Sequence, residues 1–167
     1  AVASYLPDFA SMDIIDPDGA LRPAKRVMLL EHLLTHRSGL TYGFLPGCAA
    51  AKRYREAKLG ISAPPLKEMI DTIASLPLAF EPGSEWRYSV ATDVVARIIE
   101  IVERKPLQDI VADRILKPLN LSDTGFTVTE DKRDRLMPVF GREDLDGLMN
   151  FPDGPQQLIP VDVSPHY

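Results

Sequence analysis

The chain has 167 residues, a length that fits one domain and lets it bury roughly 70% of the surface exposed on unfolding. Its net charge of −5 argues against a nucleic-acid partner, because such domains carry a basic surface. No apolar run approaches the ~20 residues of a membrane-spanning helix, and no lipidation motif is found.

The first predicted element is a brief hairpin inside an irregular segment. Prolines and glycines interrupt the first 23 residues, and Asp16-Pro17-Asp18-Gly19 is a strong turn signal. We therefore expect short strands around Ile14 and Leu21.

A buried helix of about ten residues is predicted next, within "KRVMLLEHLLTHRSGL". We expect Gly39 to close this helix in a left-handed cap. The apolar positions wrap most of the helix circumference, which is typical of a buried helix; they are Val27, Met28, Leu29, Leu30, Leu33 and Leu34.

Two further helices are predicted before residue 77. The stretch "TYGFLPG" (residues 41–47) has the composition of a lid-like loop, and it leads into a short helix rich in Ala, Lys, Arg and Glu. A second helix follows Pro64 and Pro65, with one apolar face and an end at Pro77. Its face residues are Leu66, Met69, Ile70 and Ile73.

The clearest helix of the chain follows Tyr88. Glu81-Pro82-Gly83-Ser84 predicts a type II turn just before it. Two apolar ridges then run along the helix, namely Val90, Val94, Ile98 and Val102 on one and Ala91, Val95 and Ile99 on the other. Pro106 begins another helix, with inward positions at Leu107, Ile110, Val111 and Ile115.

Residues 127–167 form a polar tail that Pro and Gly interrupt. We expect it to be irregular, with strand pieces near 136–140. The whole chain (residues 1–167) is thus predicted to be a single, mostly helical fragment.

The common catalytic and ligand-binding motifs are absent. The sequence has no Gly-x-Ser-x-Gly, phosphate loop, dinucleotide fingerprint or His-Glu-x-x-His, and neither Ser-x-x-Lys nor Lys-Thr-Gly. Cys48 is the one cysteine, so we expect an incidental thiol. His32 and His36 lie four apart without further ligands, so we expect no metal.

Three blocks of the sequence nevertheless resemble the serine β-lactamase-like hydrolases. They are "LLEHLLTHRSGL", "FEPGSEWRYSVATDVVARIIEIV" and "PLQDIVADRILKPLNLSDTGF". The resemblance extends over roughly residues 5–126. The family includes class C β-lactamases, D-alanyl-D-alanine carboxypeptidases of the penicillin-binding type, and family VIII carboxylesterases. The resemblance implies a mainly α fold class: the helical subdomain of an α/β serine hydrolase, with the sheet-bearing part largely absent.

The resemblance also implies a catalytic role for Tyr88. Tyr88-Ser89-Val90 matches the second motif of the family, whereas Ser-x-x-Lys is expected upstream of Tyr5 and the Lys-Thr-Gly type strand downstream of Tyr167. Tyr88 would be the general base for the serine. A free phenol has a pKa of about 10, so it needs a neighbouring cation to act at neutral pH. The motif lysine would supply that cation, so the chain alone is expected to be inactive.

Five other residues are substrate-binding candidates by the same resemblance. Val90 replaces the asparagine of the lactamases and cannot donate a hydrogen bond, which favours an ester-cleaving enzyme. Ser89 lies near the site or caps the next helix, and Trp86 lines the pocket or anchors the core. Tyr42 and Phe44 would border the cleft. His36 and Ser38 are expected to form a structural helix end.

Two functions of different classes stay open on the sequence. The first is a hydrolase that forms an acyl-serine ester from a small ester, or from a β-lactam or D-Ala peptide, without any metal or organic cofactor. The second is a non-catalytic binding protein on the same scaffold. The apolar helix at 27–34 predicts an exposed apolar face and possible self-association. The sequence does not assign a compartment, and any signal peptide would lie outside the chain.

Overall fold

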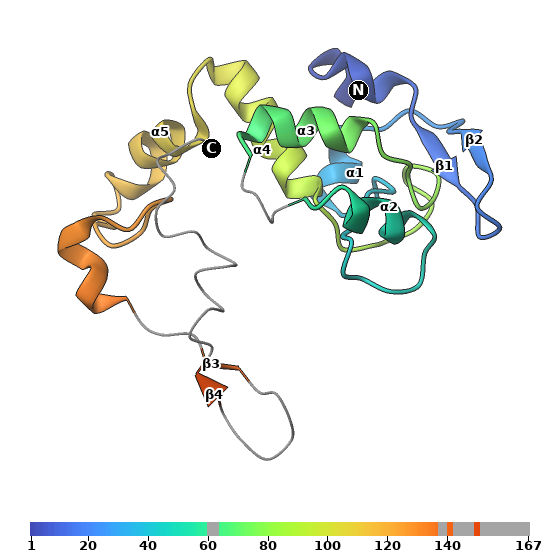
Figure 1. The fold of residues 1–167 in the computed structure, drawn as a ribbon. Helices are drawn as coiled ribbons and strands as arrows, with labels where there is room; N and C mark the ends of the chain where they lie inside the picture. Colours follow the sequence, from blue (N-terminus) through green and yellow to red (C-terminus); the bar gives the residue numbers. More distant parts are fainter. Residues whose placement is uncertain (60–63, 137–139, 142–148, 151–167) are drawn as a thin grey trace.

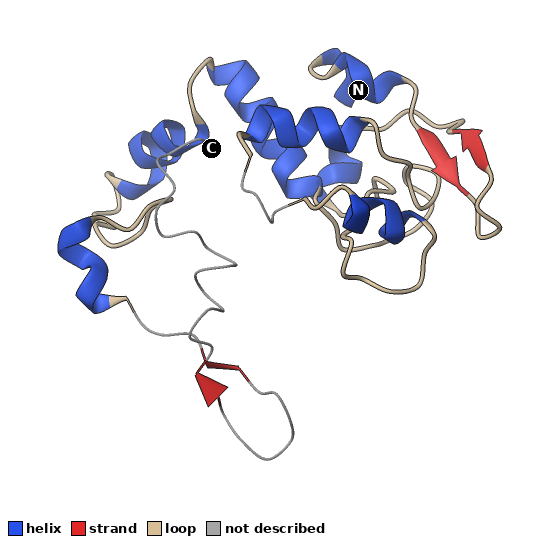
Figure 2. Ribbon diagram, in the orientation of Figure 1, coloured by secondary structure: helices blue, strands red, loops and turns tan. Residues whose placement is uncertain are grey.

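The computed structural model describes residues 1–59, 64–136, 140–141 and 149–150. Helices dominate this part of the chain, as Figures 1 and 2 show, and the strands form only two short hairpins, so the mainly α expectation is confirmed. In chain order the elements are η1 (Val2–Ser4), η2 (Pro7–Ala10), β1 (Asp13–Ile15), β2 (Leu21–Pro23), α1 (Leu30–Leu34), α2 (Ala50–Glu56), α3 (Leu66–Ala74), α4 (Ala91–Glu103), α5 (Leu107–Val111), the π-helical η3 (Ala112–Leu116), η4 (Glu130–Arg135), β3 (Phe140–Gly141) and β4 (Met149–Asn150).

The predicted N-terminal hairpin is present. β1 and β2 pair antiparallel, with Ile14 opposite Arg22, and Gly19 takes a φ of 91° in the turn between them. The hairpin is also joined to the chain before the Pro-Gly turn. Leu78 N–H donates to Asp13 O at 2.7 Å, and Ile15 N–H donates to Leu78 O at 3.1 Å. The hairpin therefore helps to fix where the segment after Leu78 begins.

Helix α1 is much shorter than predicted. It begins at Leu30, whereas Val27 is 64% exposed and lies before the helix. The cause lies far along the chain, because the Glu81 carboxylate accepts hydrogen bonds from the amides of Lys25 (2.9 Å) and Arg26 (3.2 Å). Amides bound in this way hold the chain in a non-helical course with a bend at Arg26, ahead of the helix. The prediction of a helix of about ten residues was wrong, because α1 has five residues.

His36, and not Gly39, closes α1. His36 has a φ of 54°, its N–H donates to Leu33 O at 3.2 Å, and Arg37 N–H donates to His32 O at 2.7 Å. This is the Schellman pattern, with His36 as its left-handed residue. Gly39 also has a positive φ, of 88°, but for another reason: a Cβ there would lie 2.4 Å from Phe80 O.

The buried core gathers in the first hundred residues. Every member of the main buried cluster in the described residues lies between Val2 and Ile98. Helix α4 packs against both α1 and α3, and in Figure 1 α1–α4 lie together beside the hairpin. The predicted faces of α3 and α4 are inward up to Ile98. Ile99, the next residue, and Val102, one turn further along α4, are exposed.

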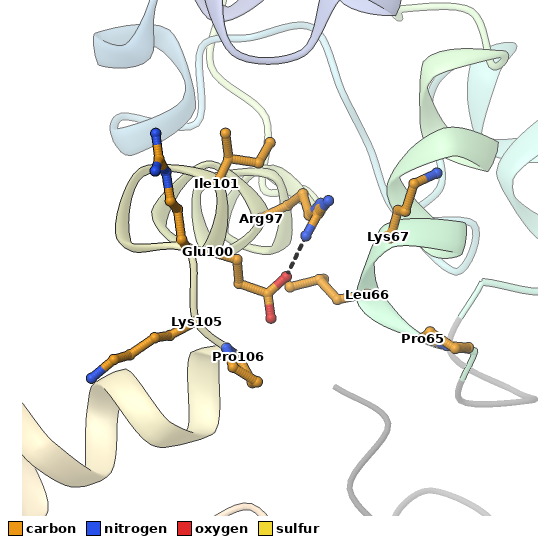
Figure 3. A pocket seen from close by; sticks show the side chains of 9 residues that line it. Pro65, Leu66, Lys67, Arg97, Glu100, Ile101, Lys105 and Pro106 are labelled. Atoms are coloured by element: carbon orange, nitrogen blue, oxygen red, sulfur yellow. Dashed lines mark hydrogen bonds and ion pairs between the residues drawn. The ribbon is translucent and has the colours of Figure 1, made fainter.

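A buried carboxylate joins α4 to α5. Glu100 accepts hydrogen bonds from Arg97 (2.9 Å) and from the backbone N–H of Leu107 (2.9 Å), the first residue of α5. Figure 3 shows Glu100 and Arg97 in the pocket of about 560 Å³ between α3, α4 and Pro106. The hydrogen bonds of Glu100 in this pocket connect α4 to α5, so we assign the pocket a structural role. The inward position predicted for Ile115 was wrong, since its side chain is 47% exposed.

The predicted strand pieces near 136–140 lie mostly outside the described residues. Phe140 does begin β3, which pairs antiparallel with β4, so Phe140 lies opposite Asn150. In the part of the chain that the structure describes, no helix is long and apolar enough to cross a membrane.

The exposed side chains around α1 lead to a prediction about association. Leu34 is 69% exposed at the end of α1, and exposed apolar surface of this kind promotes contact between copies. We expect the purified chain to self-associate with rising concentration, and Leu34→Lys to weaken that association. Sedimentation velocity measures it. Thr72→Lys, at an exposed position of α3, adds the same charge elsewhere and should leave association unchanged; equal effects of both variants would contradict the prediction.

Candidate active site

The Pro-Gly turn ahead of Tyr88 is formed as predicted and is anchored by Glu81. Ser84 N–H donates to Glu81 O at 2.9 Å, and Gly83 has a φ of 83°. The Glu81 carboxylate pairs with Arg22 Nη1 at 2.6 Å. Burial opposes ionisation of this carboxylate, but the hydrogen bonds from Arg22 and from the Lys25 and Arg26 amides lower the pKa of Glu81 overall. The turn is thus fixed to the N-terminal hairpin.

The segment after the turn runs along the end of α1. Gly83 N–H donates to Arg37 O at 2.7 Å, and Arg37 Nη2 donates to Gly83 O at 2.7 Å. Further along, Arg87 N–H donates to His36 O at 2.9 Å. These bonds hold residues 83–87 against the end of α1, so Tyr88 is presented next to His36.

Four predicted site residues form a row of ring contacts together with His36. Tyr88 is 49% exposed, and its ring centroid lies 5.0 Å from that of His36 and 5.2 Å from that of Tyr42. Tyr42 stacks on Phe44 at 4.9 Å, and Trp86 meets His36 edge-on at 6.4 Å. Phe44 and Trp86 are 71% and 67% exposed. The structure therefore places a phenol at the surface between aromatic side chains that are open to a ligand.

The two phenols differ in their surroundings. Burial, the nearby Asp93 carboxylate, and the charge and hydrogen bond of Tyr88 together raise the pKa of Tyr42 to about 12. Burial likewise raises the pKa of Asp93, which lies in the first turn of α4. The Tyr42 hydroxyl is therefore harder to ionise than that of an ordinary tyrosine.

Ser89 and Val90 lie beneath the site. Both side chains are buried. The Ser89 hydroxyl lies 3.3 Å from His36 Nδ1, and it accepts a hydrogen bond from Ala91 N–H at 3.3 Å, at the first residue of α4. Ser89 thus links the end of α1 to the start of α4. Substrate contact by Ser89 and Val90 stays a prediction.

Sequence reasoning missed the position of His36 and the role of Arg87. His36 does end a helix, as expected, but its left-handed backbone also turns its ring toward Tyr88 and Trp86. Arg87 donates to Thr41 Oγ1 at 2.7 Å, across 46 residues of sequence. The adjacency of Arg87 to Tyr88 was visible in the sequence, but a partner so distant was not.

A cavity of about 510 Å³ adjoins Trp86, and Gly47, Cys48, Ala49 and Arg87 are among the residues that line it. Cys48 Sγ lies 3.9 Å from Thr41 Oγ1. Within the described residues, no three His, Cys, Asp or Glu side chains come together as metal ligands would.

Comparison with known proteins gives a family for this arrangement. The model of the Beta-lactamase family matches residues 1–159. The chain is 37% identical over 113 residues to Esterase EstB of Burkholderia gladioli, covering 64% of this chain. It is 36% identical over 145 residues to the lovastatin esterase of Penicillium rubens, covering 83% of this chain.

A solved structure agrees with these sequence matches. EstCE1, described as a hydrolase with promiscuous acyltransferase activity, superposes with a TM-score of 0.68 at 29% identity, over 89% of this chain. The chain covers 28% of EstB, 36% of the lovastatin esterase and 38% of EstCE1. It therefore spans well under half the length of the proteins that it matches.

Gly83 allows a test of the turn that presents Tyr88. A Cβ on Gly83 would lie 2.7 Å from His32 Nε2 and would also force a side chain into a positive φ. We expect Gly83→Ala to lower the free energy of unfolding by about 2 kcal/mol or more, measured by urea unfolding. Gly19→Ala is the matched control, since Gly19 has a positive φ but nothing within 4 Å of its Cβ position. Equal losses in the two variants would contradict a role for the His32 contact.

His32 makes stability depend on pH. Its Nδ1 accepts the Leu29 N–H at 3.2 Å, and burial lowers the pKa of His32 below its ordinary value. The unfolded chain therefore binds the proton more readily than the folded chain. Stability should be complete above the unfolded pKa of about 6.5 and should fall as the pH drops through it toward the lower folded pKa.

Urea midpoints at pH 7.5 and 5.5 measure this effect. We expect the wild type to lose stability at the lower pH, and His32→Asn, which keeps an acceptor for Leu29 N–H, to lose less. A variant that shows the same pH dependence as the wild type would assign the effect to other groups.

Proposed function

Because this chain belongs to the Beta-lactamase family, we propose that it is the central helical part of a serine hydrolase that cleaves esters through an acyl-enzyme. The family contains hydrolases and acyltransferases. In our proposal Tyr88 is the general base, and the Ser-x-x-Lys pair and the Lys-Thr-Gly type strand lie outside residues 1–167. Such a fragment would be inactive alone.

The observation that carries the proposal is the placement of Tyr88. A general base needs both a fixed position within hydrogen-bond reach of its partner and an open side toward it. Tyr88 follows an anchored turn, is tied to α1 through its neighbour Arg87, and is half exposed. The fixed position and the open side of Tyr88 support this role.

The proposed chemistry balances around the Tyr88 hydroxyl. The Tyr88 phenolate takes the serine proton as the serine oxygen attacks the ester carbonyl, and the phenol then gives this proton to the departing alcohol. In the second half, the phenolate takes a proton from water as the water attacks the acyl-serine. The phenol then returns this proton to the serine oxygen, and the acid is released. A cation beside the phenol is needed for the phenolate to form near neutral pH, and the motif lysine would provide it.

Esters are favoured over β-lactams and D-Ala peptides as substrates. Val90 stands where the lactamases carry an asparagine, and its buried side chain offers no hydrogen bond to a substrate amide. The relatives named above include two esterases. The exposed rings of Phe44 and Trp86 would contact the apolar part of the ester, and Tyr42 would support Phe44 from behind.

Acyl transfer is a second candidate, because EstCE1 is described as a hydrolase with promiscuous acyltransferase activity. The two activities share the acyl-enzyme and differ in what attacks it. Adding an alcohol acceptor to an ester assay distinguishes them by the ratio of new ester to free acid.

A binding protein without the nucleophile is the alternative from a different class. The coding sequence upstream of Ala1 decides it directly. A Ser-x-x-Lys there supports the hydrolase, and its absence supports the binding protein.

Tyr88→Phe in the full-length gene product tests the general base. We expect kcat/KM for p-nitrophenyl butyrate to fall about 10²–10⁴-fold, since this is the usual contribution of such catalysis. Tyr5→Phe removes a hydroxyl from another partly exposed tyrosine and should have no effect. A loss of less than about tenfold in Tyr88→Phe would remove Tyr88 from that role.

The isolated 167-residue chain supplies the complementary control. It should turn over neither the ester nor nitrocefin, because the nucleophile lies elsewhere in the proposal. Hydrolysis by the isolated chain that disappears in Tyr88→Phe would contradict the placement of the nucleophile outside these residues.

A further inference from the structure

The loop that carries Tyr42 and Phe44 has few hydrogen bonds of its own. We call residues 41–47 the substrate loop. Within it the backbone makes a hydrogen bond from Leu45 N–H to Tyr42 O, at a long 3.3 Å. The stacked pair of Tyr42 and Phe44 nevertheless keeps a defined contact with Tyr88. Something outside the loop must therefore hold it.

The guanidinium of Arg87 binds the substrate loop near both of its ends. Its Nε donates to Thr41 Oγ1 at 2.7 Å, and its Nη2 donates to Leu45 O at 3.1 Å and Pro46 O at 2.7 Å. Thr41 itself is fully buried. A guanidinium can make such bonds together because its donors form a rigid planar fork. One side chain thus closes the loop across its ends.

The backbone of Arg87 is also held in place, next to Tyr88. Its own N–H donates to His36 O at 2.9 Å, and the next residue is Tyr88. None of the ion pairs found among the described residues involves Arg87; there its side-chain hydrogen bonds go to neutral oxygens of the loop. The side-chain contacts of Arg87 therefore serve to position the loop, and among the described residues they do not pair the guanidinium charge with a carboxylate.

We propose that Arg87 is a positioning residue for substrate binding, which clamps the substrate loop to the Tyr88 segment and so places Tyr42 and Phe44 at the site. It acts through the loop and does not touch the substrate. The substrate part of this inference rests on the proposed ester hydrolase. Lysine cannot replace Arg87, because a single ammonium lacks the planar fork.

A second arginine binds the middle of the same loop. Arg55 of α2 donates from Nε to Gly43 O at 3.0 Å, and a Cβ on Gly43 would lie 2.6 Å from Arg55 N. The loop thus lies directly on α2, and the lid-like loop expected from sequence is held on two sides. Arg53, on the same helix, pairs with its neighbour Glu56 at 3.7 Å and serves as a matched control.

Chymotrypsin cleavage of the full-length protein under native conditions tests the clamp without any substrate. The enzyme cuts after aromatic residues, and Phe44 is exposed in the loop. Native cleavage follows the fraction of time that a segment is open. We expect Arg87→Ala and Arg87→Lys to be cut after Phe44 about tenfold faster than the wild type, at a temperature well below the melting temperature of each variant. Arg53→Ala should be cut at the wild-type rate.

Kinetics test the consequence for binding. We expect Arg87→Lys to raise KM for p-nitrophenyl butyrate about tenfold, to raise it less for p-nitrophenyl acetate, and to change kcat by less than about threefold. If Arg87→Ala fails to fold, Arg87→Lys, which keeps the charge, carries both measurements.

Each outcome decides a separate statement. Unchanged cleavage in both Arg87 variants would overturn the clamp. Faster cleavage with an unchanged KM and a reduced kcat would assign Arg87 to the chemical step and overturn its role in binding. A full-length protein that cleaves no ester would overturn the proposed function, while the cleavage rates would still decide whether Arg87 holds the loop.

Discussion

The contact between the end of α1 and residues 83–87 is the constraint on which the site depends. Gly83 bonds the Arg37 backbone, and Arg87 bonds the His36 backbone. They are made where His36 adopts the left-handed conformation that ends α1. Such a conformation is uncommon outside glycine and costs on the order of 1 kcal/mol or more. Here it brings one histidine ring into contact with Tyr88 and Trp86 while its backbone binds the segment that carries them.

The elements that the sequence predicted well are those whose causes are local. The type II turn follows from Pro82 and Gly83 alone, and the faces of α3 and α4 follow from apolar spacing within each helix. Helix α1 was predicted too long because its start is decided by Glu81, more than fifty residues away. Its end was assigned to Gly39 because glycine is the usual left-handed residue, whereas close approach to Phe80 O explains that glycine.

The candidate site also has one part that the sequence predicts and one part that it does not. Tyr88 could be found from a short motif, because the family resemblance assigns a role to one tyrosine after one turn. The grouping around it could not be derived from spacing, since His36 meets Ser89 across 53 residues and Arg87 meets Thr41 across 46. Such contacts are products of the folded chain, and sequence periodicity carries no information about them.

The arrangement separates the placement of the proposed base from the shape of the binding surface. Tyr88 is fixed by backbone bonds to α1 and by the turn anchored at Glu81. Tyr42 and Phe44 are fixed by arginine side chains that hold a loop. Changes at Phe44, whose ring stacks on Tyr42, could therefore alter which apolar group is accepted without moving the Tyr88 phenol. The relatives include esterases and acyltransferases, and a rigid base beside a separately held loop is a physical basis on which one scaffold could accept different acyl groups.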